Sequence, residues 1–130
     1  MYCLDTNIII DILEGEESVK KKFEIILNSG EEIYITPITL CELYKGAYLF
    51  FNQKEEVEEI EDFVSSFILL NFGEDACREY GRIYASLKKS GKMSEEADLM
   101  IASVVKVNDL ILVTRNKKHF ENTGVKLEIW

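Results

Sequence analysis

Strand-like apolar segments alternate with amphipathic helical stretches along this chain, and this alternation limits the fold more than any other feature. The strand-like segments are residues 2–4, 33–36, 67–72, 110–113 and 126–130. No Asn-Gly or similar hairpin signal joins any two of them. Parallel strands need long crossovers, because the chain must return to the same end of the sheet. The pattern therefore predicts an α/β fold with a parallel sheet, helices on both faces and the order β-α-α-β-α-α-β-α-α-β-turn-β.

Local signals refine this prediction. We expect Pro37 to end the second strand and Thr39 to cap the following helix. The run 67–72 is apolar except for Asn71, which is typical of a core strand, whereas the alternating polarity of 126–130 predicts an edge strand. A length of 130 residues with 47% hydrophobic side chains suits one domain over residues 1–130.

Composition excludes several classes of protein. There is no apolar run of about 18 residues, so no membrane span is expected. The N-terminus lacks a basic segment, and Asp5 and Asp11 interrupt its apolar stretch, which argues against a signal peptide. The three cysteines form no CxxC pair. We interpret them as reduced, mostly buried thiols of a cytoplasmic protein.

The net charge of −9 disfavours a non-specific binder of duplex DNA, which needs a basic face. It permits divalent cations, basic partners, or nucleic acid approached through a metal ion. Acidic residues crowd the helical stretch 54–66. That stretch is either a solvated helix face or a docking surface for a basic partner.

Three carboxylates lie where the predicted topology would bring them together. Asp5 follows the first strand, Glu42 lies in the helix after the second, and Asp98 lies early in the helix before the fourth. Ligands gather at the carboxyl ends of such strands. Taken singly, the same residues have simpler interpretations as a helix cap, a helix-dipole residue and a solvated acid.

Converging carboxylates repel one another unless a cation compensates their charge. Hard ions such as Mg²⁺ and Mn²⁺ prefer oxygen ligands, and they activate water for attack on a phosphodiester. The residues thus suggest an acidic Mg²⁺ or Mn²⁺ pocket. We interpret Asp11, Asp75 and Asp109 as capping or surface residues outside it.

Four blocks, together with the last strand, resemble PIN-domain ribonucleases of the VapC toxin type. They are 4–10 (LDTNIII), 39–47 (TLCELYKGA), 98–102 (DLMIA), 112–120 (LVTRNKKHF) and the tail 125–130. They occur in order over essentially the whole chain. The resemblance implies a Rossmann-like, three-layer PIN fold with a five-stranded parallel sheet. It also implies Mg²⁺- or Mn²⁺-dependent endonucleolytic cleavage of RNA, a homodimer, and a VapB-type antitoxin that blocks the pocket.

The resemblance also assigns residues. Asp5, Glu42 and Asp98 match the acidic triad and are the expected metal ligands, and Asn116 stands where the family often has Asp. We therefore expect Asn116 to position a water or ligand without adding charge, with Glu121 as an alternative acid. Further expectations concern the neighbours of these residues. Thr6 and Thr114 are expected to contact metal-bound waters, Asn7 to order the loop after the first strand, and His119 to have a structural role.

Other residues are candidates for binding partners. Positive charges near the blocks that would offset RNA phosphates are Lys45, Lys88, Lys89, Lys92 and Arg115, unless they are ordinary surface charges. Four aromatic residues would either bind an antitoxin or second subunit or belong to the core: Tyr44, Tyr48, Phe50 and Phe51.

Four alternative functions are compared with this chain. A haloacid-dehalogenase-type phosphatase needs Asp-x-Asp after the first strand, where this chain has Asn7. A receiver domain needs Asp at the end of the third strand, where Asn71 and Phe72 stand. A flap-type DNA nuclease is longer and richer in acids. A degenerate PIN-fold binding module without nuclease activity is the main alternative, and Asn116 mildly favours it.

Overall fold

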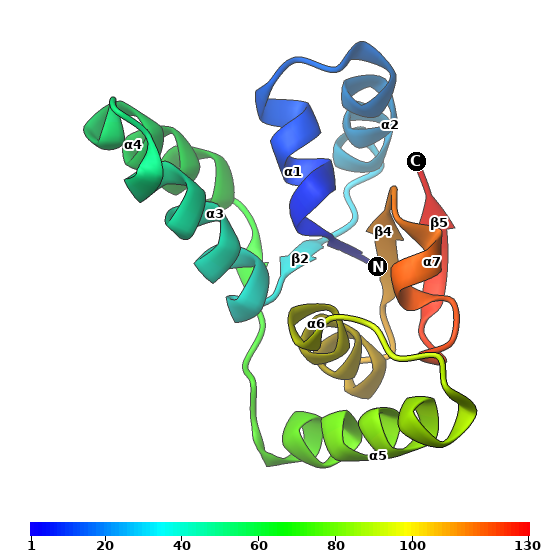
Figure 1. Cartoon of the computed structure of the whole chain (residues 1–130). Coiled ribbons are helices and arrows are strands. Elements are labelled where there is room, and N and C mark those ends of the chain that lie inside the picture. The colour runs from blue at the N-terminus through cyan, green and yellow to red at the C-terminus, as the bar shows by residue number, and fades with distance from the viewer.

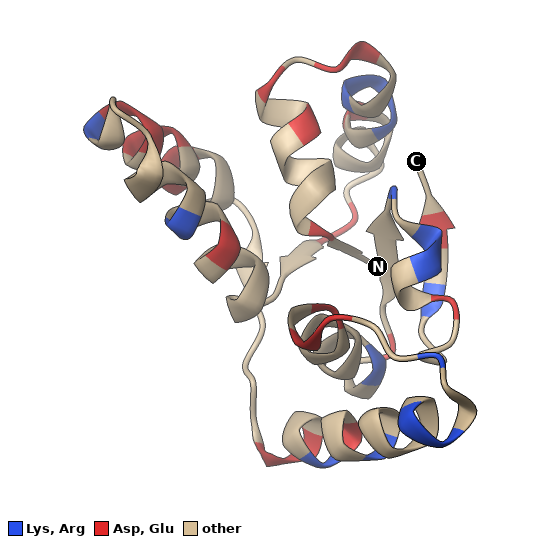
Figure 2. Ribbon diagram, viewed as in Figure 1, with Lys and Arg blue, Asp and Glu red and all other residues tan.

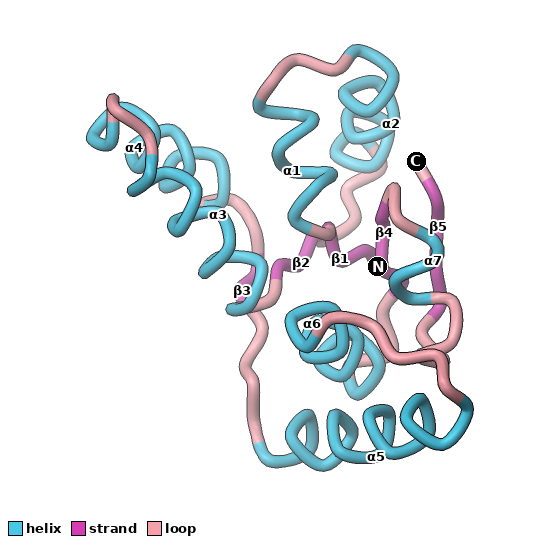
Figure 3. Tube along the Cα trace, in the orientation of Figure 1, coloured by secondary structure: helices cyan, strands magenta, loops and turns pink.

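A single five-stranded sheet runs through the structure, a computed structural model that describes residues 1–130 (Figures 1 and 3). Its strands are β1 (Tyr2–Leu4), β2 (Ile33–Ile35), β3 (Ile68–Leu69), β4 (Ile111–Thr114) and β5 (Lys126–Ile129). They are arranged in the order β3-β2-β1-β4-β5, and every neighbouring pair is parallel. The predicted parallel sheet is confirmed.

Seven helices connect the strands. They are α1 (Thr6–Leu13), α2 (Glu17–Asn28), α3 (Pro37–Leu49), α4 (Gln53–Val64), α5 (Glu74–Ser90), α6 (Glu96–Val107) and α7 (Lys117–Phe120). The element order agrees with the prediction except that the short helix α7 replaces the expected turn before β5. None of the helices combines the length and apolar character needed to cross a membrane.

Each face of the sheet carries its own hydrophobic core. Successive strand residues point to opposite faces, so Cys3 and Leu112 enter one core whereas Leu4 and Val113 enter the other. The first core is completed by α5, α6 and α7, and the second by α1, α2, α3 and α4. Figure 1 shows the same division, with α5 and α6 below the sheet and α1 and α2 above it. Helices therefore cover both faces, as expected.

The third strand differs from the prediction. Only Ile68 and Leu69 pair with a neighbour, and both side chains are exposed, so the expected core strand over 67–72 is wrong. The physical reason is position: β3 is the outermost strand and has a partner on one side only. The run resembles a core strand in sequence because its other apolar residues, Phe67, Leu70 and Phe72, do pack against the two cores.

The cap of α3 is Thr36 and not Thr39. The Thr36 hydroxyl accepts a hydrogen bond from the Thr39 backbone N–H at 3.1 Å. Pro37 ends β2 as predicted, but it also starts the helix, because the first helical residue needs no N–H donor. Glu42 consequently lies in the second turn of α3.

The cysteines are less buried than expected. Cys3 is fully buried between β2 and β4, whereas Cys41 and Cys77 are exposed on helices. Burial raises the pKa of the Cys3 thiol well above its ordinary value. Cys3 therefore behaves as a hydrophobic core residue.

Candidate active site

Asp5 is fixed where β1 meets β4. It is the N-cap of α1, and its backbone N–H donates to the Val113 carbonyl at 2.9 Å. The carboxylate is 4% exposed and both of its oxygens accept hydrogen bonds. Oδ1 accepts from the Thr6 backbone N–H at 2.8 Å, and Oδ2 accepts from the Thr114 hydroxyl at 2.7 Å. Asp5 is therefore a buried, oriented oxygen donor at the carboxyl edge of the sheet.

Glu42 approaches Asp5 from α3 and is linked to it through Thr6. The Thr6 hydroxyl donates to Glu42 Oε1 at 2.6 Å, while the backbone N–H of the same residue binds Asp5. The expected contact of Thr6 and Thr114 with metal-bound waters stays a prediction. Both hydroxyls donate directly to carboxylates, so they orient the acids themselves.

Asp98 reaches the same edge from the first turn of α6. Its Oδ2 lies 3.2 Å from Nδ1 of His119, a residue that follows β4 on α7. The His119 carbonyl accepts a hydrogen bond from the Ser94 hydroxyl at 3.0 Å, which ties α7 to the segment before α6. The imidazole therefore touches a triad carboxylate, while the structural role expected of His119 stays a prediction.

The three carboxylates influence one another electrostatically. Burial raises the pKa of Asp5, the two hydrogen bonds oppose this, and the charge of Glu42 adds to it. The pKa of Asp98 is raised to about 6: burial is the largest cause, the contact with His119 opposes it, and the charges of Asp5, Glu42 and Glu95 add to it. Asp5, Glu42 and Asp98 are thus brought to one edge, as the topology predicts.

This donor set suits a hard divalent cation, because it consists of mutually repelling carboxylate oxygens. As the side chains stand, no three acidic, histidine or cysteine side chains are close enough to share one ion. Asp5 is held by two hydrogen bonds, whereas Glu42 and Asp98 are only partly buried. Asp5 is therefore the most firmly held of the three carboxylates, and Glu42 is held by the single bond from Thr6.

The other expected site residues lie at the edge of this cluster. Asn116 precedes α7, and its backbone N–H donates to the Thr114 hydroxyl at 3.0 Å, while its side chain forms no capping bond. Glu121 is exposed at the end of α7. The additional acid whose charge acts on Asp98 is Glu95 and not Glu121. Asn7 lies within α1 and not in a loop.

Asp11 is neither a cap nor a surface residue. It is buried on α1, and both carboxylate oxygens accept from Nη1 of Arg115 at 2.7 Å. The pair joins α1 to the segment after β4, 104 residues away. One signal was available in the sequence: Asp11 interrupts the apolar residues 8–13, and a charge in such a stretch usually has a buried partner. The partner itself is decided by the fold.

We expect Arg115→Ala to lower the free energy of unfolding by about 1–3 kcal/mol, because it leaves the Asp11 carboxylate buried and unpaired. The measurement is urea unfolding at pH 7. Lys126→Ala is the matched control, since Lys126 pairs with the exposed Asp109 at 2.8 Å. Lys126→Ala should lower the free energy of unfolding by less than about 1 kcal/mol. Equal losses in the two variants would contradict the assignment of Asp11 and Arg115 as a structural pair.

The remaining two acids behave as predicted. Asp75 Oδ1 accepts from the Ala76 backbone N–H at 2.8 Å at the start of α5, and Asp109 is exposed. The acids of α4 lie almost entirely on its exposed face, while Val57, Ile60 and Phe63 face the core.

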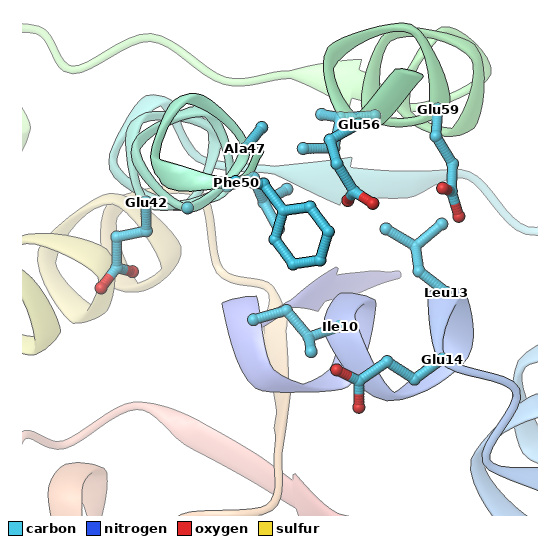
Figure 4. Close-up of a pocket in the computed structure, with 11 residues that line it drawn as sticks. Ile10, Leu13, Glu14, Glu42, Ala47, Phe50, Glu56 and Glu59 are labelled. Atoms are coloured by element: carbon cyan, nitrogen blue, oxygen red, sulfur yellow. The ribbon is translucent and has the colours of Figure 1, made fainter. Parts of the chain in front are cut away.

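A groove of about 340 Å³ lies beside the acidic cluster, between α1, α3 and α4. Its lining is apolar at Ile10, Leu13 and Phe50 and acidic at Glu14, Glu56 and Glu59. Figure 4 shows these acids around the apolar side chains, with the Glu42 carboxylate pointing away from Phe50. Glu42 of α3 therefore lies between the cluster and the groove, and Phe50, which follows the end of α3, lines the groove.

Exposed apolar side chains continue from this groove over the turn between α3 and α4. They are Tyr48, Leu49, Phe50 and Phe51, of which Phe51 is 87% exposed. Tyr44 is partly buried against the core. Of the four aromatic residues considered in the sequence, only Tyr44 belongs to the core, and the other three are exposed.

Charge is distributed unevenly around the molecule. Figure 2 shows Lys and Arg along α5 and on α7, and Asp and Glu over α4. The expected phosphate-binding residues Lys45, Lys88, Lys89 and Lys92 are all exposed, whereas Arg115 is paired with Asp11. Exposed lysines thus gather on α7 and around the end of α5, which we call the basic side, whereas α4 is mostly acidic.

Residues 2–126 match the PIN domain family. Ribonuclease VapC2 of Haemophilus influenzae is 33% identical over 134 residues, which cover 99% of this chain and 97% of the relative. The tRNA(fMet)-specific endonuclease VapC of Shigella flexneri is 34% identical over 131 residues, with the same coverage of 99% and 97%.

Solved structures agree with these matches. VapBC2 from Rickettsia felis bound to a DNA fragment from its promoter superposes with a TM-score of 0.91 at 27% identity, covering 99% of this chain and 98% of that one. VapBC-1 from nontypeable Haemophilus influenzae gives a TM-score of 0.89 at 30% identity, covering 99% and 97%.

Proposed function

Because the chain belongs to the PIN-domain family of VapC-type ribonucleases, we propose that it is a metal-dependent endoribonuclease and a toxin neutralised by a VapB-type antitoxin. The observation that carries the proposal is the convergence of Asp5, Glu42 and Asp98 at one edge of the sheet. These acids come from three segments far apart in sequence, and two are oriented by threonine hydroxyls. A chain kept only for its fold has no need to maintain such repelling charges.

Asp5, Glu42 and Asp98 are the residues that would hold Mg²⁺ or Mn²⁺. When bound, the ion would polarise a phosphoryl oxygen and acidify a water for in-line attack. Thr114 and Thr6 keep the Asp5 and Glu42 carboxylates oriented, which preorganises the site before RNA arrives. The Asn116 backbone N–H donates to the Thr114 hydroxyl, and we expect its side chain to position a water or a ligand without adding charge.

The substrate proposed for this site is RNA, and the basic side offers its approach. Lys117 and Lys118 are exposed on α7, directly before His119, and Lys88, Lys89 and Lys92 are exposed around the end of α5. These charges would offset phosphate repulsion from an otherwise acidic protein.

The test is cleavage of an end-labelled structured RNA by the purified protein with Mg²⁺, with Mn²⁺ and with EDTA. We expect cutting within the RNA chain in either metal and none in EDTA, because the three acids alone cannot compensate the charge of the reacting phosphate. A DNA of the same sequence should remain intact. No cutting over a broad RNA panel, with metal binding intact, would favour the degenerate binding module instead.

The groove between α1, α3 and α4 is the proposed docking site of the antitoxin. Its apolar lining and its glutamates fit a basic amphipathic segment, and α3 places it beside Glu42. A segment bound there would lie next to the acidic cluster and block access to it. The exposed residues Tyr48, Leu49 and Phe51 supply further apolar surface for the antitoxin or for a second copy in the proposed homodimer.

A further inference from the structure

We propose that His119 is a ligand of the divalent ion and that its imidazole nitrogen makes the site prefer Mn²⁺ to Mg²⁺. The proposal deepens the proposed function and rests on it, because it assigns a fourth ligand to the same metal site. Its starting point is one contact between segments that are distant in sequence, Nδ1 of His119 and Oδ2 of Asp98.

The separation of these two atoms suits ligands of one ion. Nδ1 and Oδ2 are 3.2 Å apart. Adjacent ligands of an octahedral ion with bonds of about 2.1–2.2 Å are roughly 3 Å apart. The two donor atoms thus already have nearly the spacing of neighbouring positions in such a coordination shell.

The position of His119 is set by its surroundings. The next residue, Phe120, is 1% exposed in the core, and the His119 carbonyl is held by the Ser94 hydroxyl. The imidazole itself is 50% exposed, so an ion arriving from solvent can reach it. The backbone is therefore anchored through Phe120 and the His119 carbonyl, while the donor atom lies next to Asp98.

Imidazole nitrogen changes which ion the site favours. Mg²⁺ binds oxygen ligands and retains waters, whereas transition ions accept imidazole readily. The other proposed ligands, Asp5, Glu42 and Asp98, supply oxygen only. A single nitrogen donor therefore adds affinity for Mn²⁺ with little gain for Mg²⁺.

The contact between His119 and Asp98 has an alternative explanation, which predicts the opposite effect of removing the imidazole on metal binding. Protonated His119 would then act as a positive counter-charge to Asp98, occupying the place of the cation and competing with it. Removing the imidazole would strengthen binding of both ions under this alternative, whereas it weakens Mn²⁺ binding if His119 is a ligand.

The experiment is pulsed electron paramagnetic resonance of Mn²⁺ bound to the full-length, untagged protein. We expect a ¹⁴N coupling typical of imidazole, and its assignment is unambiguous because the chain has one histidine. In His119→Ala this coupling should disappear. Calorimetry should show Mn²⁺ binding weakened by at least about tenfold and Mg²⁺ binding by less than about threefold. Lys118→Ala, one residue away on α7, is the matched control and should leave both affinities unchanged.

Three results would overturn the proposal. Mn²⁺ bound to the wild type without imidazole coupling excludes His119 as a ligand, and this measurement needs no variant that has to fold. Tighter binding of both ions by His119→Ala favours the counter-charge. If neither ion binds the wild type, the proposed metal-dependent function falls as well. Mg²⁺-dependent cleavage of RNA by the wild type would uphold that function even where the inference about His119 fails.

Discussion

Asp5→Asn should lower the rate of RNA cleavage by at least about a hundredfold while the protein stays folded. Mutation of a residue that hydrogen-bonds to a metal ligand typically lowers metal affinity or activity 10–100-fold. Loss of the charge of a buried ligand itself should therefore lower activity by at least about a hundredfold. The amide oxygen can still accept from Thr114, and the variant no longer buries a carboxylate whose pKa is raised by desolvation. The variant loses the hydrogen bond from the Thr6 backbone N–H, because the amide has one acceptor oxygen, so stability should change far less than activity.

The measurement is the cleavage rate at saturating Mg²⁺ or Mn²⁺, with the melting temperature recorded on the same preparations. Asp75→Asn is the matched control, because the Asp75 carboxylate accepts a backbone hydrogen bond at the start of α5 and lies outside the cluster. It should retain the wild-type rate. An Asp5→Asn protein that cleaves within threefold of the wild type would show that Asp5 is not a metal ligand.

Asp98→Asn should also abolish metal-dependent cleavage, and it should stabilise the metal-free protein at pH 7. Folding raises the pKa of Asp98 from 3.8 to about 6, chiefly through burial. A raised pKa means that the carboxyl contributes most to stability when protonated. This contribution is complete below about pH 4, falls as the pH rises toward 6 and is lost above that.

At pH 7 the wild type therefore carries the full cost of a buried, ionised Asp98, and the asparagine variant does not. We expect a gain of about 1–3 kcal/mol, nearer the lower end because the contact with His119 is lost as well. The gain should shrink toward zero near pH 4. Addition of Mn²⁺ reverses the order, since an ion at a hundred times its Kd stabilises the wild type by about 2.7 kcal/mol and should do little for the variant.

Thermal unfolding from pH 4 to pH 8, with and without Mn²⁺, measures these differences. Glu95→Gln serves as the control, because Glu95 only adds charge near Asp98 and should change both the pH profile and the metal response slightly. A wild-type protein more stable than Asp98→Asn at pH 7 without metal would contradict the cost assigned to this carboxylate.

The periodic features of the chain were sufficient to predict most of the fold. Alternation of apolar runs with amphipathic stretches requires crossovers, and crossovers require parallel strands. That topology in turn predicts that Asp5, Glu42 and Asp98 lie at the carboxyl edge of the sheet, without any information on side-chain positions. The run 67–72 shows the limit of this reasoning. The sequence shows how apolar a strand is, but it does not show whether the strand has neighbours on both sides. Because β3 lies at the edge of the sheet, it has a neighbour on one side only.

The chain by itself therefore determined the parallel sheet with helices on both faces, because these follow from patterns repeated over many residues, and its resemblance to the family identified the three acids. Only the tertiary structure decided which side chains meet. Thr114 reaches Asp5 over 109 positions, Arg115 reaches Asp11 over 104, and His119 faces Asp98. Such contacts depend on the directions of single side chains brought together by packing. No local propensity encodes them, which is why His119 looked structural in the sequence and lies at the candidate metal site in the fold.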